Sequence, residues 1–151
     1  MLVLHANGGT GTYQISAGSL LGLEFGVAGP AGAPCDLALA DKNLALDALQ
    51  RDRLLGAVAA AVLIAESRDL ERAMIAGIRA LSNAPKSVGK AGRRLQQAAN
   101  RDTKALKRID EAIDRGEAGI LKGARRKIDN ARRKLKVACD GLQDGGASLI
   151  P

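Results

Sequence analysis

Residues 124–137 read ARRKIDNARRKLKV, which is two copies of one seven-residue unit. Aligning residues 91–142 in sevens extends this unit over a third of the chain. Small and aliphatic residues that alternate four and three apart form one side of a helix. The repeat therefore predicts helices that pack closely through a seam. The first position holds Ala91, Ala98, Ala105, Ala112, Gly119, Ala124, Ala131 and Ala138, and the fifth holds Leu95, Asp102, Ile109, Gly116, Gly123, Ile128, Leu135 and Leu142.

The repeat contains one irregular step, of five residues instead of seven, between Gly119 and Ala124. On a straight helix this step rotates the seam by about 140°, so its two halves would face different partners. Gly116 and Gly123 also lie here, and each glycine costs about 1 kcal/mol relative to alanine inside a helix. We therefore predict a turn or a kink at residues 116–123 in preference to a straight helix, and an antiparallel helical hairpin of residues 87–115 and 120–140.

The fourth position of the repeat is basic in every unit but the last. Residues 122–136 contain eight Lys and Arg and a single acid, Asp129, so pairing within the helix cannot neutralise them. A solvated helix face is the simpler interpretation, but such a stripe repels itself unless an anionic partner neutralises it. The candidate binding residues are Lys122, Arg125, Arg126, Lys127, Arg132, Arg133, Lys134 and Lys136.

Charge divides the chain of 151 residues into two halves. The net charge is +7, but residues 1–85 contain six Lys and Arg against eight Asp and Glu, and residues 86–151 contain 17 against eight. Aromatic residues make up 1% and Trp is absent, so side chains that could stack on bases are scarce. No helix-turn-helix or zinc-finger pattern is present. The basic half is therefore expected to contact phosphates without sequence preference, or acidic surfaces of other subunits.

The N-terminal region is expected to form strands. Alternating residues at 12–16 and 21–27, with an Asn-Gly hairpin signal at Asn7, predict a three-stranded β-meander over about residues 1–27. A Gly- and Pro-rich linker follows, so residues 1–33 are interpreted as a region for pairing between subunits by strand addition.

The helical region, residues 34–151, is predicted to begin with helices at 34–66 and 68–83. Pro34 and Asp36 suit a helix start, Ser67 and Asp69 suit the second cap, and Pro85 ends it. Residues 54–65 are 12 apolar residues in succession, too few to span a bilayer. They predict a core helix buried on every side, with a subunit contact or membrane insertion as alternatives. The fold class is thus mainly α, with a small β-meander before Ala-rich amphipathic helices.

Features of an enzyme are not found in the sequence. No cluster of complementary titratable groups, metal-ligand spacing or phosphate-loop motif appears, so no catalytic residue, metal or cofactor is assigned. Cys35 and Cys139 lie in segments of different character, which argues against a disulfide. No signal peptide or membrane span is apparent, so a reducing environment, cytoplasmic or within a virion, is expected.

These patterns lead to a functional hypothesis: a non-enzymatic structural component of a homo-oligomeric assembly, such as a minor capsid, neck or internal protein of a bacteriophage. The alternatives are a freestanding basic helical protein that binds nucleic acid non-specifically, and a peripheral membrane protein. Membrane binding is the least favoured partner. The residues expected to pack between subunits are Leu21, Leu23, Phe25, Val58, Val62, Ile109, Ile113, Ile128 and Leu135.

Overall fold

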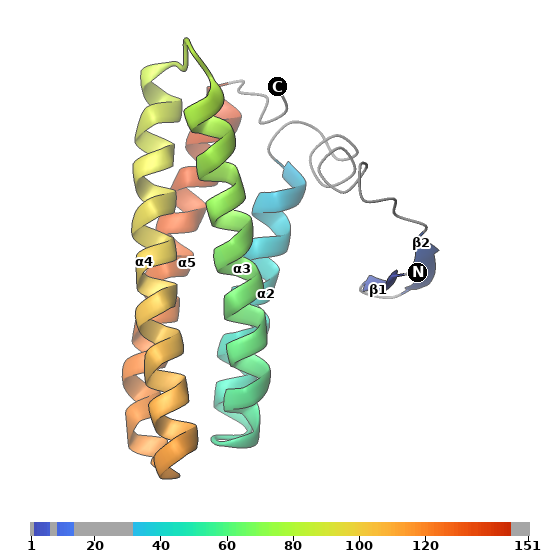
Figure 1. Cartoon of the computed structure of the whole chain (residues 1–151), viewed down its shortest axis with the longest axis vertical. Helices are drawn as coiled ribbons and strands as arrows, with labels where there is room; N and C mark the ends of the chain where they lie inside the picture. The colour runs from blue at the N-terminus through green and yellow to red at the C-terminus, as the bar shows by residue number, and fades with distance from the viewer. Residues whose placement is uncertain (1, 7–8, 14–31, 146–151) are drawn as a thin grey trace.

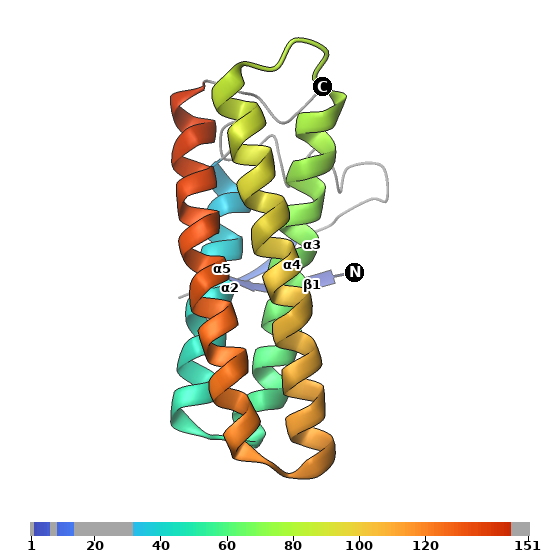
Figure 2. The same ribbon diagram turned by 90° about the vertical axis from the view of Figure 1, so that its left-hand side faces the viewer.

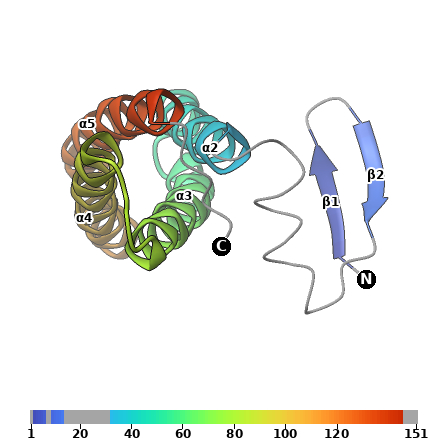
Figure 3. The same ribbon diagram turned by 90° about the horizontal axis from the view of Figure 1, so that it is seen from above.

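The computed structural model describes residues 2–6, 9–13 and 32–145, and its body is an antiparallel four-helix bundle (Figures 1 and 2). The helices form a ring in which α2 and α4 each pack against α3 and α5 (Figure 3). Consecutive helices run in opposite directions and are joined by short turns, which is the up-down topology of simple bundles. The helices are α2 (Gly32–Arg51), α3 (Leu55–Ala80), α4 (Lys86–Arg115) and α5 (Ala118–Asp144).

The predicted fold class is wrong, because the architecture is a helical bundle and no strand takes part in it among residues 32–145. Outside the bundle the structure describes one two-stranded hairpin, with β1 (Leu2–Ala6) antiparallel to β2 (Gly9–Tyr13). The third strand predicted at residues 21–27 lies outside the described residues. The helices bury their seams against one another, so the bundle does not need a sheet to cover its core.

The first two helices do not have the predicted boundaries. The chain reverses at residues 52–54, in the polar run Arg51-Asp52-Arg53, so the apolar segment that follows starts α3 instead of ending a longer helix. Gly56 makes this tight reversal possible, because a Cβ atom there would lie 2.1 Å from the carbonyl oxygen of Ala48. Ser67 is not a cap; it lies inside α3 and donates a hydrogen bond to the Ala38 carbonyl of α2 (3.1 Å).

Residues 54–65 are only partly buried, which corrects the prediction of a helix enclosed on every side. Ala57, Ala60 and Ile64 are fully buried, and they lie on the side of α3 that faces the bundle. Val58 and Val62 keep 54% and 55% of their surface exposed. The segment is therefore an ordinary helix with one face in the core and an apolar outer face.

The second pair of helices has the turn that the irregular step predicts. Gly116 takes a left-handed conformation, with φ of 63°, between α4 and α5. The Glu117 N–H donates to the Ala112 carbonyl at 3.1 Å, which satisfies one of the last carbonyls of α4. The first positions of the repeat, from Ala91 to Ala138, are buried except Gly119 at the turn, and the Leu and Ile residues at the fifth position are buried as well.

The core consists of two apolar clusters separated by a polar layer. One cluster contains Leu95 and Leu135, and the other contains Ile109 and Ile128. Both are rich in alanine, which lets the helices approach closely but contributes less apolar area per residue than leucine. The layer between them consists of Lys42, Ser67, Glu71 and Asp102, all fully buried.

A disulfide between Cys35 and Cys139 joins the first turn of α2 to the C-terminal part of α5 (Cα–Cα distance 5.9 Å). The sequence-based expectation that these cysteines do not pair is wrong, because closing the ring of helices brings together residues 104 positions apart. Disulfides persist mainly in oxidising environments, so the bond also argues against the reducing environment expected from the sequence.

Candidate anion-binding groove

A groove lined by basic side chains runs between α4 and α5 on the outer surface of the bundle. Near the α4–α5 turn it is bounded by Arg101 and Arg108 from α4 and by Arg126 and Lys127 from α5. Gly119 and Gly123 also line this part, and a Cβ atom at Gly123 would meet no other atom within 4 Å. The groove is therefore open, with small residues between two basic sides.

The groove continues along α4 toward the helix start. Arg101 and Lys127 also line the neighbouring depression, together with Lys104 and Gln97, and Gln97 lines the next one as well. Among the described residues, no Asp or Glu lines any of these three connected depressions. We call these three adjoining depressions together the α4–α5 groove; its bases are Lys90, Arg93, Arg94, Arg101, Lys104, Arg108, Arg126 and Lys127.

The seven-residue repeat explains why bases from two helices line one groove. Arg94, Arg101 and Arg108 occupy the fourth position on α4, and Lys127 occupies the same position on α5. In an antiparallel pair, the same flank of each helix faces its partner, so one repeat position from both helices meets at one groove. Residues seven apart lie about 10.5 Å apart along a helix, which sets the spacing of the charges.

The predicted basic stripe on α5 is divided between two flanks. Lys127 lines the α4–α5 groove and Arg125 and Arg132 turn toward α2, whereas Arg126 borders both sides. Arg125 donates to the Gln50 side chain and Arg132 to the Asn43 side chain, each at 3.1 Å.

Asp129 neutralises part of the stripe on the α2 side, because it pairs with both Arg132 and Arg133 at 2.7 Å. Lys122 and Lys136 are exposed, and Lys134 is half-buried one repeat beyond Lys127. Arg108, one of the bases of the groove, pairs with Glu111 of its own helix at 3.2 Å, although Glu111 does not line the groove. The groove therefore keeps most of its positive charge, while the α2 side of α5 is partly compensated.

The basic residues of α4 were not among the predicted site residues. Lys90, Arg94 and Lys104 contribute as much to the groove as the residues of α5 do. The signal was present in the sequence, since the fourth position of the repeat is basic along α4 too. Although the antiparallel hairpin was predicted, recognising the groove required knowing which side chains of the two helices line the space between them.

The residues predicted to pack between subunits fall in different places. Ile109, Ile128 and Leu135 are fully buried in the chain's own core. Val58, Val62 and Ile113 are exposed, and Leu21, Leu23 and Phe25 lie outside the described residues. Exposed apolar residues gather instead on the outside of the first two helices. We call this surface the α2–α3 face; it consists of Leu37, Leu44, Leu55, Val58 and Val62.

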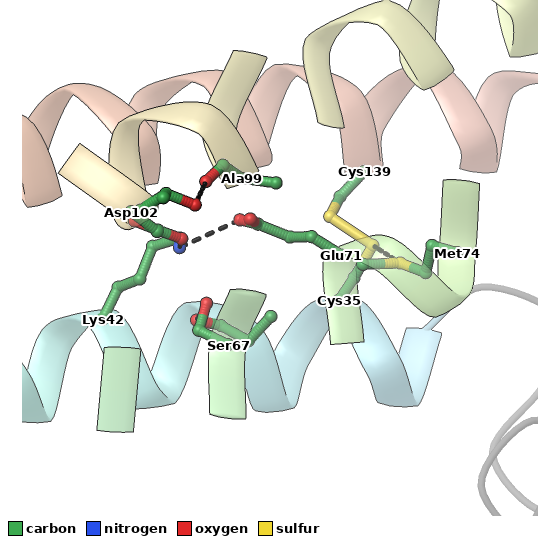
Figure 4. Close-up of polar contacts among 10 residues, drawn as sticks. Cys35, Lys42, Ser67, Glu71, Met74, Ala99, Asp102 and Cys139 are labelled. Atoms are coloured by element: carbon green, nitrogen blue, oxygen red, sulfur yellow. Dashed lines mark hydrogen bonds and ion pairs between the residues drawn. A yellow bond between two sulfur atoms is a disulfide. The ribbon is translucent and has the colours of Figure 1, made fainter. Parts of the chain in front are cut away.

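The buried polar layer is the other unusual cluster of charge (Figure 4). Lys42 Nζ lies 2.9 Å from Glu71 Oε1 and donates a hydrogen bond to Asp102 Oδ2. The contact with Glu71 is close but is not a well-directed hydrogen bond, since neither Glu71 oxygen has a hydrogen-bond partner among the described residues. One ammonium thus faces two carboxyl groups in a solvent-free interior.

Two carboxyl groups with one ammonium cannot both ionise at low cost inside a protein. Burial raises the pKa of Glu71 to about 8, against the opposing attraction of Lys42. Burial also raises the pKa of Asp102, and Lys42 again opposes the shift. Glu71 therefore keeps its proton at neutral pH, and the layer carries little net charge. Because all three side chains are fully buried, the layer presents no surface to an external ligand.

No family model, curated protein or solved structure matches this chain. Within the part of the chain that the structure describes, no helix is long and apolar enough to cross a membrane, and no group of His, Cys, Asp or Glu could hold a metal ion.

Proposed function

We propose that this chain is a non-enzymatic protein that binds nucleic acid along the α4–α5 groove, through phosphate contacts and without sequence preference. One observation carries the proposal: three adjoining depressions along two helices that are lined together by eight bases and, among the described residues, by no acid. Such an arrangement attracts a polyanion more strongly than scattered surface charges do, because its charges act on one ligand together.

The chemistry of the groove favours phosphate over base recognition. Arg94, Arg101 and Arg108 present planar guanidinium groups, which can donate two hydrogen bonds to one phosphate. They extend from the flanks of a groove, so a sugar-phosphate backbone could lie between them. The groove offers no protruding helix that could enter the major groove of DNA and read base edges. Release of counterions from the phosphates would supply most of the binding free energy.

The test is binding of long mixed-sequence DNA to the full chain at about 50 and 200 mM salt, measured by fluorescence anisotropy. The variant Arg94→Glu/Arg101→Glu/Lys104→Glu should bind roughly 100-fold more weakly at the lower salt. The slope of log affinity against log salt concentration should be less steep by about 3, which is one unit for each lost phosphate contact. The matched control is Arg51→Glu/Arg72→Glu/Arg79→Glu, which makes the same change in net charge on α2 and α3. Equal losses in both variants, or no binding by the wild type at low salt, would contradict the proposal.

A second candidate function is a subunit of a homo-oligomeric assembly, such as a virion component that lies next to packaged nucleic acid. The α2–α3 face favours it, because Leu55 is 77% exposed beside Val58 and Val62 on the same helix. Light scattering of the purified protein should then show an oligomer that persists at high salt. The variant Val58→Asp/Val62→Asp should be monomeric. A wild-type monomer at high protein concentration would remove this candidate.

A further inference from the structure

We infer that the α4–α5 groove takes a preformed nucleic-acid duplex in preference to a single strand. This inference rests on the proposed function, and it names the ligand of the same site. It follows from three properties of the groove: its bases are borne by helices packed in a rigid bundle, its length is short compared with the persistence length of a duplex, and among the described residues no aromatic side chain lines it.

The charges of the groove are held on a rigid frame. Arg94, Arg101 and Arg108 follow one line on α4, and the buried face of α4 packs against both α3 and α5. The disulfide between Cys35 and Cys139 fixes α5 against α2 in turn. The bases therefore present a preset spacing, which favours a ligand whose phosphates are already in place.

The dimensions of the groove suit one face of a duplex. From Lys90 to Arg108 the groove extends over 18 residues of α4, which is about 27 Å of helix. A duplex with a persistence length of about 50 nm is straight over this distance and brings its phosphates already ordered. A single strand would have to lose conformational freedom to match the same rows. A duplex carries one charge per about 1.7 Å of axis, so 27 Å contains about 16 phosphates, and one face offers about as many as the groove has bases.

The groove lacks the feature by which proteins favour single strands. Single-strand sites usually combine bases with aromatic rings on which nucleobases stack. The aromatic residues of this chain are Tyr13 and Phe25, and neither belongs to the bundle. The uncharged residues that line the groove near its turn are Gly119, Gly123, Ile120 and Asn130. A single strand therefore gains phosphate contacts only and leaves its bases unpartnered.

The experiment compares three ligands of about 24 nucleotides or base pairs, at the same salt and with the full chain: a mixed-sequence unstructured single strand, the DNA duplex and the RNA duplex. At least one duplex should bind about tenfold or more tightly than the single strand. The two duplex arms distinguish DNA from RNA, which have the same phosphate chemistry but different groove shapes. A single strand that binds as tightly as both duplexes would overturn the inference and leave the proposed function standing. Failure of all three ligands to bind would contradict both the inference and the proposed function.

A substitution at the floor of the groove gives a second, independent test. Gly123→Trp would add a stacking surface where a Cβ atom meets nothing within 4 Å, so the bundle should fold unchanged, as circular dichroism can verify. Single-strand affinity should rise several-fold while duplex affinity stays the same or falls. The matched control is Gly123→Leu, which adds bulk without an aromatic ring and should not raise single-strand affinity. Equal effects of Trp and Leu would count against the inference.

Discussion

The two hairpins of the bundle differ on their outer surfaces and resemble each other inside. Both α2–α3 and α4–α5 contribute alanines and aliphatic residues to the same two core clusters. Outside, the first hairpin exposes Leu55, Val58 and Val62, whereas the second exposes the bases of the α4–α5 groove. The seam residues thus determine how the helices pack, and the remaining positions are free to create two different surfaces.

The two hairpins also turn differently. At the first turn, Gly56 lies against the backbone of Ala48, so the helices approach closely. At the second turn, Gly116 takes a left-handed conformation and has open space around it. A glycine is therefore required at the first turn for space and at the second for backbone conformation.

The largest expected effect concerns the bond that joins the two hairpins. Replacing Cys35 and Cys139 with serine opens a link across 104 residues, and the chain-entropy model gives a loss of about 4.7 kcal/mol for a loop of this size. Urea unfolding followed by circular dichroism, with and without a reducing agent, measures the change. An unfolding free energy that does not respond to reduction would show that the hairpins hold together without the bond.

The next effect concerns the ionic contact across the hairpins. Lys42→Met should lower the free energy of unfolding by about 3–5 kcal/mol, because it leaves Glu71 and Asp102 buried without a positive partner. The triple variant Lys42→Met/Glu71→Leu/Asp102→Leu should recover most of this loss, since an apolar layer needs no counter-charge. If the single and triple variants were equally unstable in urea, the layer would matter through packing and not through charge.

A smaller effect contrasts the two turns directly. Gly56→Ala should destabilise the protein by about 1–3 kcal/mol, because its Cβ would overlap the Ala48 carbonyl oxygen. Gly119→Ala should stabilise it by up to about 1 kcal/mol, since the site is helical and open. Thermal unfolding of the two variants gives the comparison. Changes of the same sign would contradict the contrast between the turns.

The smallest effect, counted per pH unit, is a dependence of the free energy of unfolding on pH. The pKa of Glu71 rises from 4.5 in the unfolded chain to about 8 in the folded one, so the folded state holds the proton more firmly. The stabilisation of the folded state by this proton is fully present below pH 4.5. It is lost as pH rises toward 8, at about 1 kcal/mol of unfolding free energy per pH unit. Urea titrations between pH 5 and 8 should show this decline, and Glu71→Gln should flatten it. A wild-type stability that rises over this range would contradict the raised pKa.

The repeat allowed the second hairpin to be predicted, because a seam with an irregular step specifies both the helices and the turn between them. The first hairpin was missed because only Arg51, Asp52 and Arg53 interrupt its apolar pattern, and local pattern could not show that Gly56 packs against the preceding helix. The disulfide forms because α2 and α5 become neighbours when the four helices close into a ring. The separation of the two cysteines in the sequence does not reveal this.

Of the eight bases of the candidate groove, the sequence analysis named two, Arg126 and Lys127. The basic stripe on α5 was visible, but its division between two flanks depends on which helices lie beside α5. Arg125 and Arg132 turned out to face Gln50 and Asn43 of α2, so they belong to a contact between helices. The antiparallel hairpin was predicted, but the bases of α4 joined the candidate site only when the structure showed that they line the same depressions as Arg126 and Lys127.

The most direct test of the contrast between the two outer surfaces is a map of backbone amide chemical shifts of the isotope-labelled protein during titration with duplex DNA. The account predicts salt-sensitive shifts along the α4–α5 groove, at Arg101, Lys104, Gly123 and Lys127, with Val58 and Val62 on the α2–α3 face unchanged. Shifts confined to the α2–α3 face, with the groove amides unmoved, would contradict it.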